Sequence, residues 1–140
     1  MKTMIIYATK TGHSKKIASA IGEQLGISPQ NISEKPIIEN IDILFIGGGI
    51  YAGKSSPELI QFIETISKDN VKNVALFSTC TSGQTKLNDA KEMLIAKGIT
   101  VIEDSFVCKG QFLLFSRKHP NDVDVQNAKN FATEIVAKFL

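Results

Sequence analysis

Three short apolar runs constrain the fold more than any other feature of the chain. They lie within residues 4–8, 42–47 and 71–77, and each is followed by a loop of small or polar residues and then by a helical pattern. Apolar runs of this length are typical of strands that are covered on both faces. Strands that alternate with helices call for a parallel sheet with right-handed crossovers. The sequence therefore predicts an α/β fold with helices on both faces of a parallel sheet.

Two further strands complete the expected sheet. A short edge strand is expected around residues 31–33, and the last strand is expected to run from residue 99 to residue 107. Four helical faces are marked by apolar residues at helical spacing: Ile17, Ala18, Ile21, Leu25; Leu59, Phe62, Ile63, Ile66; Leu87, Ala90, Leu94; and Ala128, Phe131, Ala132, Ile135, Phe139. The strands and helices thus alternate five times within one domain, residues 1–140.

Length and composition exclude several classes of function. A chain of 140 residues is long enough for one domain with a substantial core. No apolar run approaches the roughly 18 residues of a membrane span, and the sequence begins with a strand rather than a leader, so a soluble cytoplasmic protein is expected. A net charge of +2 is too weak to indicate nucleic-acid binding. Only two cysteines and two histidines are present, so no metal site is predicted.

The loops after the three apolar runs are expected to meet at one edge of the sheet. They cover residues 9–14, 48–55 and 78–83. In open parallel sheets ligands bind outside the carboxyl ends of the strands, where the strand order reverses. The candidate site is therefore assembled from these three segments.

The first of these loops has the composition of an anion-binding cup. Thr9, Thr11 and Ser14 can each donate an O–H, and Gly12 lets the backbone turn close to a ligand. The N-terminus of the following helix adds backbone N–H groups and the positive end of its dipole. Neutral donors of this kind suit a phosphate monoester. An ordinary strand-to-helix turn with Ser14 as the N-cap is the alternative.

The same loop resembles the phosphate loop of flavodoxins, whose pattern is Thr or Ser, any residue, Thr, Gly, any residue, Thr or Ser. The pattern is filled here by Thr9, Lys10, Thr11, Gly12, His13 and Ser14. The resemblance implies a three-layer, doubly wound flavodoxin-like sandwich with a five-stranded parallel sheet in the order 2-1-3-4-5. It also implies flavin mononucleotide (FMN) as cofactor, with these six residues around its phosphate. The chain lacks room for the insertion of long-chain members, so it is similar to short-chain flavodoxins.

The other two loops would hold the flavin ring if the resemblance extends to them. The second contributes Gly49, Ile50, Tyr51, Ala52, Gly53 and Lys54, and the third contributes Ser78, Thr79, Cys80, Thr81, Ser82 and Gly83. Tyr51 stands where flavodoxins often stack an aromatic residue, although a partly buried loop aromatic is the alternative. The Ala52–Gly53 peptide would face the flavin N5, and Gly53 permits the change of orientation that accompanies reduction in the family. The third loop departs from the family because it has no aromatic residue.

The resemblance implies an electron carrier that receives electrons from a reductase and passes them to an acceptor enzyme. Two alternatives stay open: a flavin-dependent reductase of quinones or other small acceptors, and a dedicated electron-donor subunit of one reductase. No catalytic residue is predicted, because the flavin supplies the redox chemistry. The carrier is expected to be a monomer, without nucleic-acid or membrane partners. The segment from residue 105 to residue 121 contains no acid, so redox partners are expected to dock on it. The docking residues would be Lys109, Phe112, Arg117 and Lys118. In the alternative, the apolar residues of this segment pack under the last helix.

Overall fold

The structure, a computed structural model, describes residues 1–8, 12–51, 54–80, 87–103, 106–109 and 122–139, with only the backbone described for 50, 51, 54, 79, 80 and 107–109. In chain order the elements are β1 (Thr3–Tyr7), α1 (His13–Leu25), β2 (Gln30–Asn31), the 3-10 helix η1 (Ile32–Glu34), β3 (Ile41–Tyr51), β4 (Lys54–Ser55), α2 (Pro57–Thr65), β5 (Val71–Cys80), α3 (Asn88–Ala96), β6 (Thr100–Val101), β7 (Phe106–Lys109) and α4 (Asp122–Ala137). Strand and helix alternate along most of the chain, as the sequence predicts.

A parallel sheet forms the middle layer, in the order β2-β1-β3-β5-β6. This confirms the predicted five-stranded parallel sheet in the order 2-1-3-4-5. The edge strand is shorter and earlier than expected, at Gln30–Asn31 rather than around 31–33. The reason is local, because the Asn31 side chain accepts a hydrogen bond from the Ser33 N–H at 3.0 Å and so starts a 3-10 turn at Ile32.

The last position of the sheet is divided between β6 and β7, so the expected continuous strand from 99 to 107 is wrong. Val101 pairs with Val74, and Phe106 pairs with Phe77. Four residues therefore lie between Val101 and Phe106, whereas two lie between their partners Val74 and Phe77 on β5. A ladder cannot absorb two additional residues without a break.

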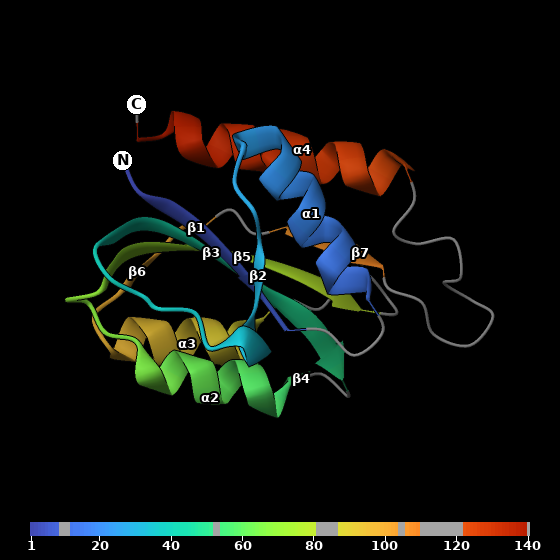
Figure 1. The fold of residues 1–140 in the computed structure, drawn as a ribbon. Helices are drawn as coiled ribbons and strands as arrows, with labels where there is room; N and C mark the ends of the chain where they lie inside the picture. Colours follow the sequence, from blue (N-terminus) through green and yellow to red (C-terminus); the bar gives the residue numbers. More distant parts are fainter. Residues whose placement is uncertain (9–11, 52–53, 81–86, 104–105, 110–121, 140) are drawn as a thin grey trace.

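Helices cover both faces of the sheet, with α1 and α4 on one face and α2 and α3 on the other (Figure 1). The core beneath α1 and α4 is centred on Phe45 and Phe77, both fully buried, and the ring of Phe131 meets that of Phe45 edge to face at 6.0 Å. The core on the α2 and α3 side is aliphatic and includes Leu44, Ile46, Leu59, Ile63, Val74, Leu76, Ala90 and Leu94. The alternation of buried side chains along β3 and β5 thus supplies both cores.

Helix ends follow the residues that the sequence marks for them. Ser56 caps α2 by accepting a hydrogen bond from the Leu59 N–H at 3.4 Å, and Pro57 occupies the first helical position. Gly26 ends α1 in the left-handed conformation at φ +72°. Phe139 is an exception, because it follows the end of α4 and is 39% exposed rather than part of the buried helical face.

One close approach in the sheet requires a glycine. Gly47 on β3 pairs with Phe77 on β5, and the Phe77 ring lies over the Gly47 backbone. A Cβ at residue 47 would stand 1.9 Å from Phe77 Cε2. The next residue, Gly48, faces the other side of the strand, where a Cβ would be 3.3 Å from Leu59 Cδ2. The two adjacent glycines therefore have different reasons for being small.

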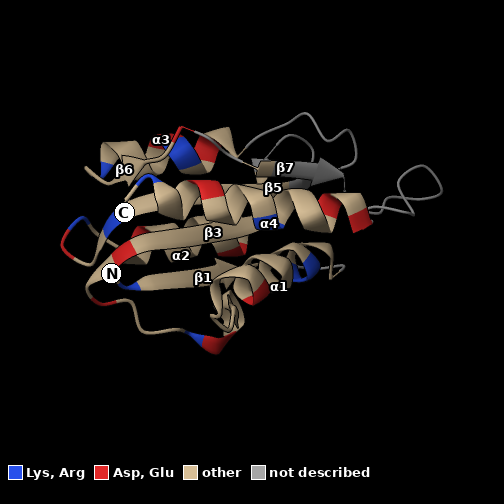
Figure 2. Ribbon diagram, turned by 90° about the horizontal axis from the view of Figure 1, so that it is seen from above, with Lys and Arg blue, Asp and Glu red and all other residues tan. Residues whose placement is uncertain are grey.

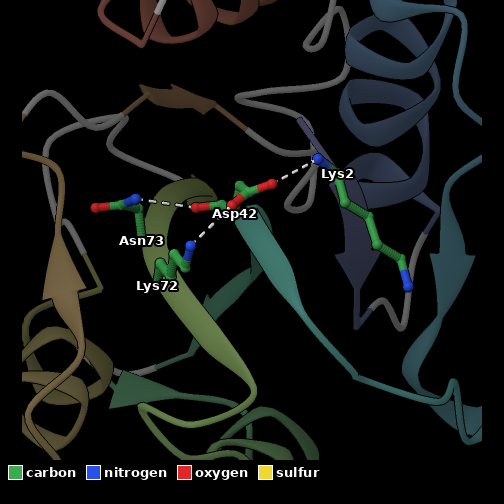
Figure 3. Close-up of polar contacts among 4 residues, drawn as sticks. All are labelled: Lys2, Asp42, Lys72 and Asn73. Carbon is green, nitrogen blue, oxygen red and sulfur yellow. Dashed lines mark hydrogen bonds and ion pairs between the residues drawn. The ribbon is translucent and has the colours of Figure 1, made fainter.

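Asp42 on β3 contacts the residue before β1 and two residues of β5 at the amino end of the sheet (Figure 3). Its carboxylate accepts a hydrogen bond from the Lys2 backbone N–H at 2.7 Å and forms an ion pair with Lys72 at 3.5 Å. Its backbone carbonyl accepts a hydrogen bond from the Asn73 side chain at 3.0 Å. The hydrogen bond from Lys2, with the Lys72 ammonium, holds the pKa of the Asp42 carboxyl below its ordinary value.

Replacement of Asp42 by asparagine is expected to lower the free energy of unfolding near neutral pH. Because the folded pKa is lowered, the carboxylate contributes stability above its unfolded pKa, ordinarily 3.8, and loses it as pH falls through the folded value. The difference between the wild type and Asp42→Asn should therefore be greatest near neutral pH and shrink in acid, as pH falls through the lowered folded pKa of Asp42. Urea denaturation of both proteins at neutral and at acid pH measures this difference. Glu64→Gln, at an exposed acid, is the control and should change the free energy of unfolding little. A difference that persists unchanged in acid would contradict the expectation.

The two chain ends lie at the same end of the molecule, at the amino ends of β1, β3 and β5 (Figure 1). Strand β1 starts at Thr3, and α4 returns to this end before residue 139. Within the part of the chain that the structure describes, no helix combines the length and hydrophobicity needed to cross a bilayer. The carboxyl ends of β1, β3 and β5 lie at the opposite end of the molecule.

Candidate functional site

The carboxyl ends of β1, β3 and β5 lie side by side, so the three candidate segments start from adjoining points. Tyr7 pairs with Gly47, and Gly49 pairs with Thr79. The Ala8 N–H also donates to the Gly47 carbonyl at 2.9 Å. Eight of the predicted site residues lie outside the described residues: Thr9, Lys10, Thr11, Ala52, Gly53, Thr81, Ser82 and Gly83. The arrangement of the others is described below.

The first segment enters α1 through Gly12. Gly12 is the N-cap, at φ +88°, a conformation that L side chains rarely adopt. The helix therefore begins at His13, and the alternative in which Ser14 is the N-cap is wrong. Ser14 is instead part of the first helical turn and is 2% exposed. Its hydroxyl lies in the turn whose backbone N–H groups point out of the helix.

The charge at the start of α1 differs from that of the other described α-helices. The first turn of α1 contains no acid, whereas the first turns of α2, α3 and α4 contain Glu58, Asp89, and Asp122 with Asp124. Lys15 and Lys16 follow Ser14 and are exposed, and Figure 2 shows acids at the start of α4 but basic residues near the start of α1. Basic residues at the positive end of a helix dipole are unfavourable unless an anion is bound there. The start of α1 is suited to an anion.

The second segment is a hairpin rather than a loop. Strand β3 continues through Gly48 and Gly49 to Tyr51, and β4 returns antiparallel to it, with Ile50 opposite Ser55 and Tyr51 opposite Lys54. Two residues, 52 and 53, stand between the last paired residues, a separation typical of tight hairpins. The sequence gives no clear signal for this hairpin, because Ala-Gly is not a pair favoured in two-residue hairpin turns and the glycines at 47–49 predict the end of the strand.

The third segment also begins later than expected. Strand β5 extends to Cys80, so Ser78, Thr79 and Cys80 belong to the strand and not to a loop. Pairing with β7 explains the extension, because Thr79 lies opposite Cys108 and Cys80 opposite Lys109. Ser78 is 2% exposed. Backbone N–H and C=O groups at the end of β5 are thus largely used in pairing with the neighbouring strands.

A contact that the sequence did not indicate joins the second segment to α3. The Ser55 backbone N–H and hydroxyl both donate to the Asp89 carboxylate, at 3.0 Å and 2.6 Å. Partial burial raises the pKa of Asp89, but the hydrogen bonds from Ser55 and Ala90 outweigh it, so the pKa lies below its ordinary value. The only sequence signal at Asp89 is an acid in the first turn of a helix, which does not identify its partner.

Other predicted features are not placed by the structure. The backbone of Lys109 ends β7, but Phe112, Arg117 and Lys118 lie outside the described residues, so the docking surface stays a prediction. The side chain of Tyr51 is not described, so its stacking role also stays a prediction. Within the described ranges, no group of three or more His, Cys, Asp or Glu side chains is arranged to hold a metal ion.

Comparison with known proteins gives the family. The sequence model of a family described as a flavodoxin domain matches residues 4–112. The chain belongs to the flavodoxin family. An uncharacterized protein of Methanocaldococcus jannaschii is 37% identical over 152 aligned positions, which cover 97% of this chain and 99% of that protein.

Solved structures of flavodoxins share the fold. A flavodoxin from the domain Archaea superimposes with a TM-score of 0.81 at 18% identity, covering 99% of this chain and 98% of that one. Oxidised Flavodoxin 2 from Bacillus cereus gives a TM-score of 0.74 at 20% identity, covering 99% of both chains. The flavodoxin fold is a flavin-binding, electron-transfer fold, so membership of the family implies a flavin cofactor.

The described residues of this flavodoxin fit the phosphate of a flavin. The start of α1 combines the positive end of the helix dipole, a buried hydroxyl at Ser14, and a cap at Gly12 without a side chain. Gly48 and Gly49, at the adjoining end of β3, have no side chains. These groups could hold a phosphate beside a strand end that is formed by glycines.

Proposed function

We propose that this flavodoxin-family protein binds FMN and carries electrons from a reductase to an acceptor enzyme. The observation that carries the proposal is the start of α1, where Gly12 is at φ +88°, Ser14 is in the first turn and acids are absent. A helix N-terminus built in this way favours a phosphate group. The family membership supports a flavin as the molecule that bears this phosphate.

The residues of the chain have separate tasks in this proposal. Ser14 and the backbone N–H groups of Gly12 and His13 orient the phosphate, together with the predicted donors Thr9, Lys10 and Thr11. The hairpin from Ile50 to Ser55 lines one edge of the ring, and Tyr51 covers one of its faces. The end of β5 and residues 81–83 line the other edge. FMN, when bound, supplies the redox chemistry, which is why no general acid or base is required.

The test is a titration of flavin-free protein followed by stepwise anaerobic reduction. FMN is expected to bind more tightly than riboflavin, which lacks the phosphate, because the cup at the start of α1 contacts only the phosphate. Visible absorption during reduction is expected to show two separated one-electron steps, as a carrier between one-electron partners requires. Fluorescence quenching of the flavin measures both affinities.

Two outcomes would overturn this proposal. If neither flavin binds, the proposed site is wrong. If reduction passes in a single two-electron step and the protein turns over a nicotinamide and a quinone, the protein is a reductase on the same fold rather than a carrier.

A further inference from the structure

The carboxylate of Asp89 joins the second candidate segment, residues 48–55, to α3, the helix that follows the third segment. Asp89 lies in the first turn of α3 and accepts two hydrogen bonds from Ser55, one from its backbone N–H at 3.0 Å and one from its hydroxyl at 2.6 Å. It also accepts a hydrogen bond from the Ala90 N–H at 2.9 Å. Three donors therefore hold one carboxylate in a fixed orientation.

This contact lies in surroundings that strengthen it. Ser55 is 8% exposed and Asp89 is partly buried, beside the fully buried Ala90. Hydrogen bonds to an ionised acceptor are about twice as strong as neutral ones, and poor access of water preserves that strength. Loss of the Asp89 carboxylate would remove the acceptor for both Ser55 donors, whereas loss of the Ser55 hydroxyl would leave Asp89 with the two backbone donors.

The position of Ser55 decides what the contact controls. Ser55 is the partner of Ile50 in the hairpin, so Asp89 fixes the returning strand of the segment that lines the proposed flavin ring. The next residue, Ser56, is held separately as the N-cap of α2. With Ser55 and Ser56 both anchored, the hairpin is fixed at its base, and its orientation follows from the Ser55–Asp89 contact.

We propose that Asp89, acting through Ser55, is a positioning residue that sets the paired backbone of residues 50–51 and 54–55 against the flavin ring. This inference rests on the proposed function. Asp89 does not contact the flavin in this proposal, because its carboxylate is turned toward Ser55 and Ala90. It orients the part of the site that meets the ring and leaves the phosphate cup at the start of α1 unaffected.

Two adjacent serines provide a matched test. Ser55→Ala removes one hydrogen bond to Asp89, whereas Ser56→Ala removes the cap of α2 one residue further on. Ser55→Ala is expected to raise the dissociation constants of FMN and riboflavin by the same factor, about tenfold. It is also expected to change the ratio of affinities for oxidised and reduced FMN by about threefold or more, measured as a shift in midpoint potential. Ser56→Ala should lower the melting temperature and leave both affinities and the potential within about twofold.

Hydrogen exchange of the flavin-free variants tests the contact without a cofactor. The amides of residues 50–55 are expected to exchange faster in Ser55→Ala, and those of the first turn of α2 in Ser56→Ala. If the wild type binds flavin but Ser55→Ala changes neither exchange nor affinity, the positioning role is wrong and the proposed function stands. If the two variants have the same profile, the contact is merely structural. If the wild type binds no flavin, the proposed function fails, and the positioning role fails with it.

Discussion

Gly47→Ala is expected to lower the free energy of unfolding by about 3 kcal/mol, the upper part of the range for overpacked cores. The new Cβ would stand 1.9 Å from Cε2 and 2.2 Å from Cδ2 and Cζ of Phe77. The Phe77 ring is fully buried in the core beneath α1 and α4, so it can move only by displacing its neighbours. Guanidinium denaturation of the two proteins measures the loss.

Two variants make this expectation specific. Gly48→Ala is the matched control on the next residue of β3, because the nearest atoms to its Cβ would be Leu59 Cδ2 at 3.3 Å, the Ala8 carbonyl oxygen at 3.5 Å and Ala8 Cβ at 3.8 Å. Gly48→Ala should lower the free energy of unfolding much less than Gly47→Ala. Adding Phe77→Leu to Gly47→Ala should recover part of the loss, because the smaller side chain vacates the space above residue 47. If Gly47→Ala were as mild as Gly48→Ala, the close approach of Phe77 would not be the reason for glycine at 47.

Ser14→Asp is expected to raise the dissociation constant of FMN at least about a hundredfold, because it sets a carboxylate against the phosphate at short range. Ser14 is in the first turn of α1, the turn that contains no acid. The substitution gives α1 the kind of charge that Glu58 and Asp89 give α2 and α3. Equilibrium titration with FMN measures the effect, and circular dichroism establishes that the variant is folded.

Riboflavin and a neutral variant are the controls for this effect. Riboflavin carries no phosphate, so its affinity should fall much less than that of FMN in Ser14→Asp. Ser14→Ala, which removes only the hydroxyl, should weaken FMN binding by about tenfold. Equal losses for FMN and riboflavin in Ser14→Asp would place the phosphate elsewhere.

Local sequence patterns predicted those parts of the fold that depend on local physics. The apolar residues around Phe45 identified a strand buried on both faces, and apolar residues at helical spacing identified the four α-helices. The division of the last strand was not predictable in this way. It depends on the two additional residues between Val101 and Phe106 relative to their partners on β5, a count that exists only once the register is known.

In the candidate site, too, local patterns predicted some features and missed others. The residues of the proposed phosphate cup are contiguous, so a local pattern can indicate it, and the alternative of an ordinary turn with Ser14 as the N-cap is wrong because Gly12 is the N-cap. Residues 48–55 are predicted to be a loop because glycines follow the apolar run, but β3 continues past these glycines and pairs with β4. The hydrogen bonds between Ser55 and Asp89 join residues 34 apart, and no local pattern specifies such a pair.

The location of both chain ends at the amino edge of the sheet has a practical consequence (Figure 1). The proposed flavin edge is at the other end of the strands, so an affinity tag, a fluorescent reporter or a surface tether attached at either terminus would lie on the far side of the molecule from it. The protein could therefore be immobilised on an electrode through its N-terminus or its C-terminus with the flavin edge facing the solution. Because Lys2 is held by Asp42, an extension of the N-terminus would also leave the molecule in a defined direction.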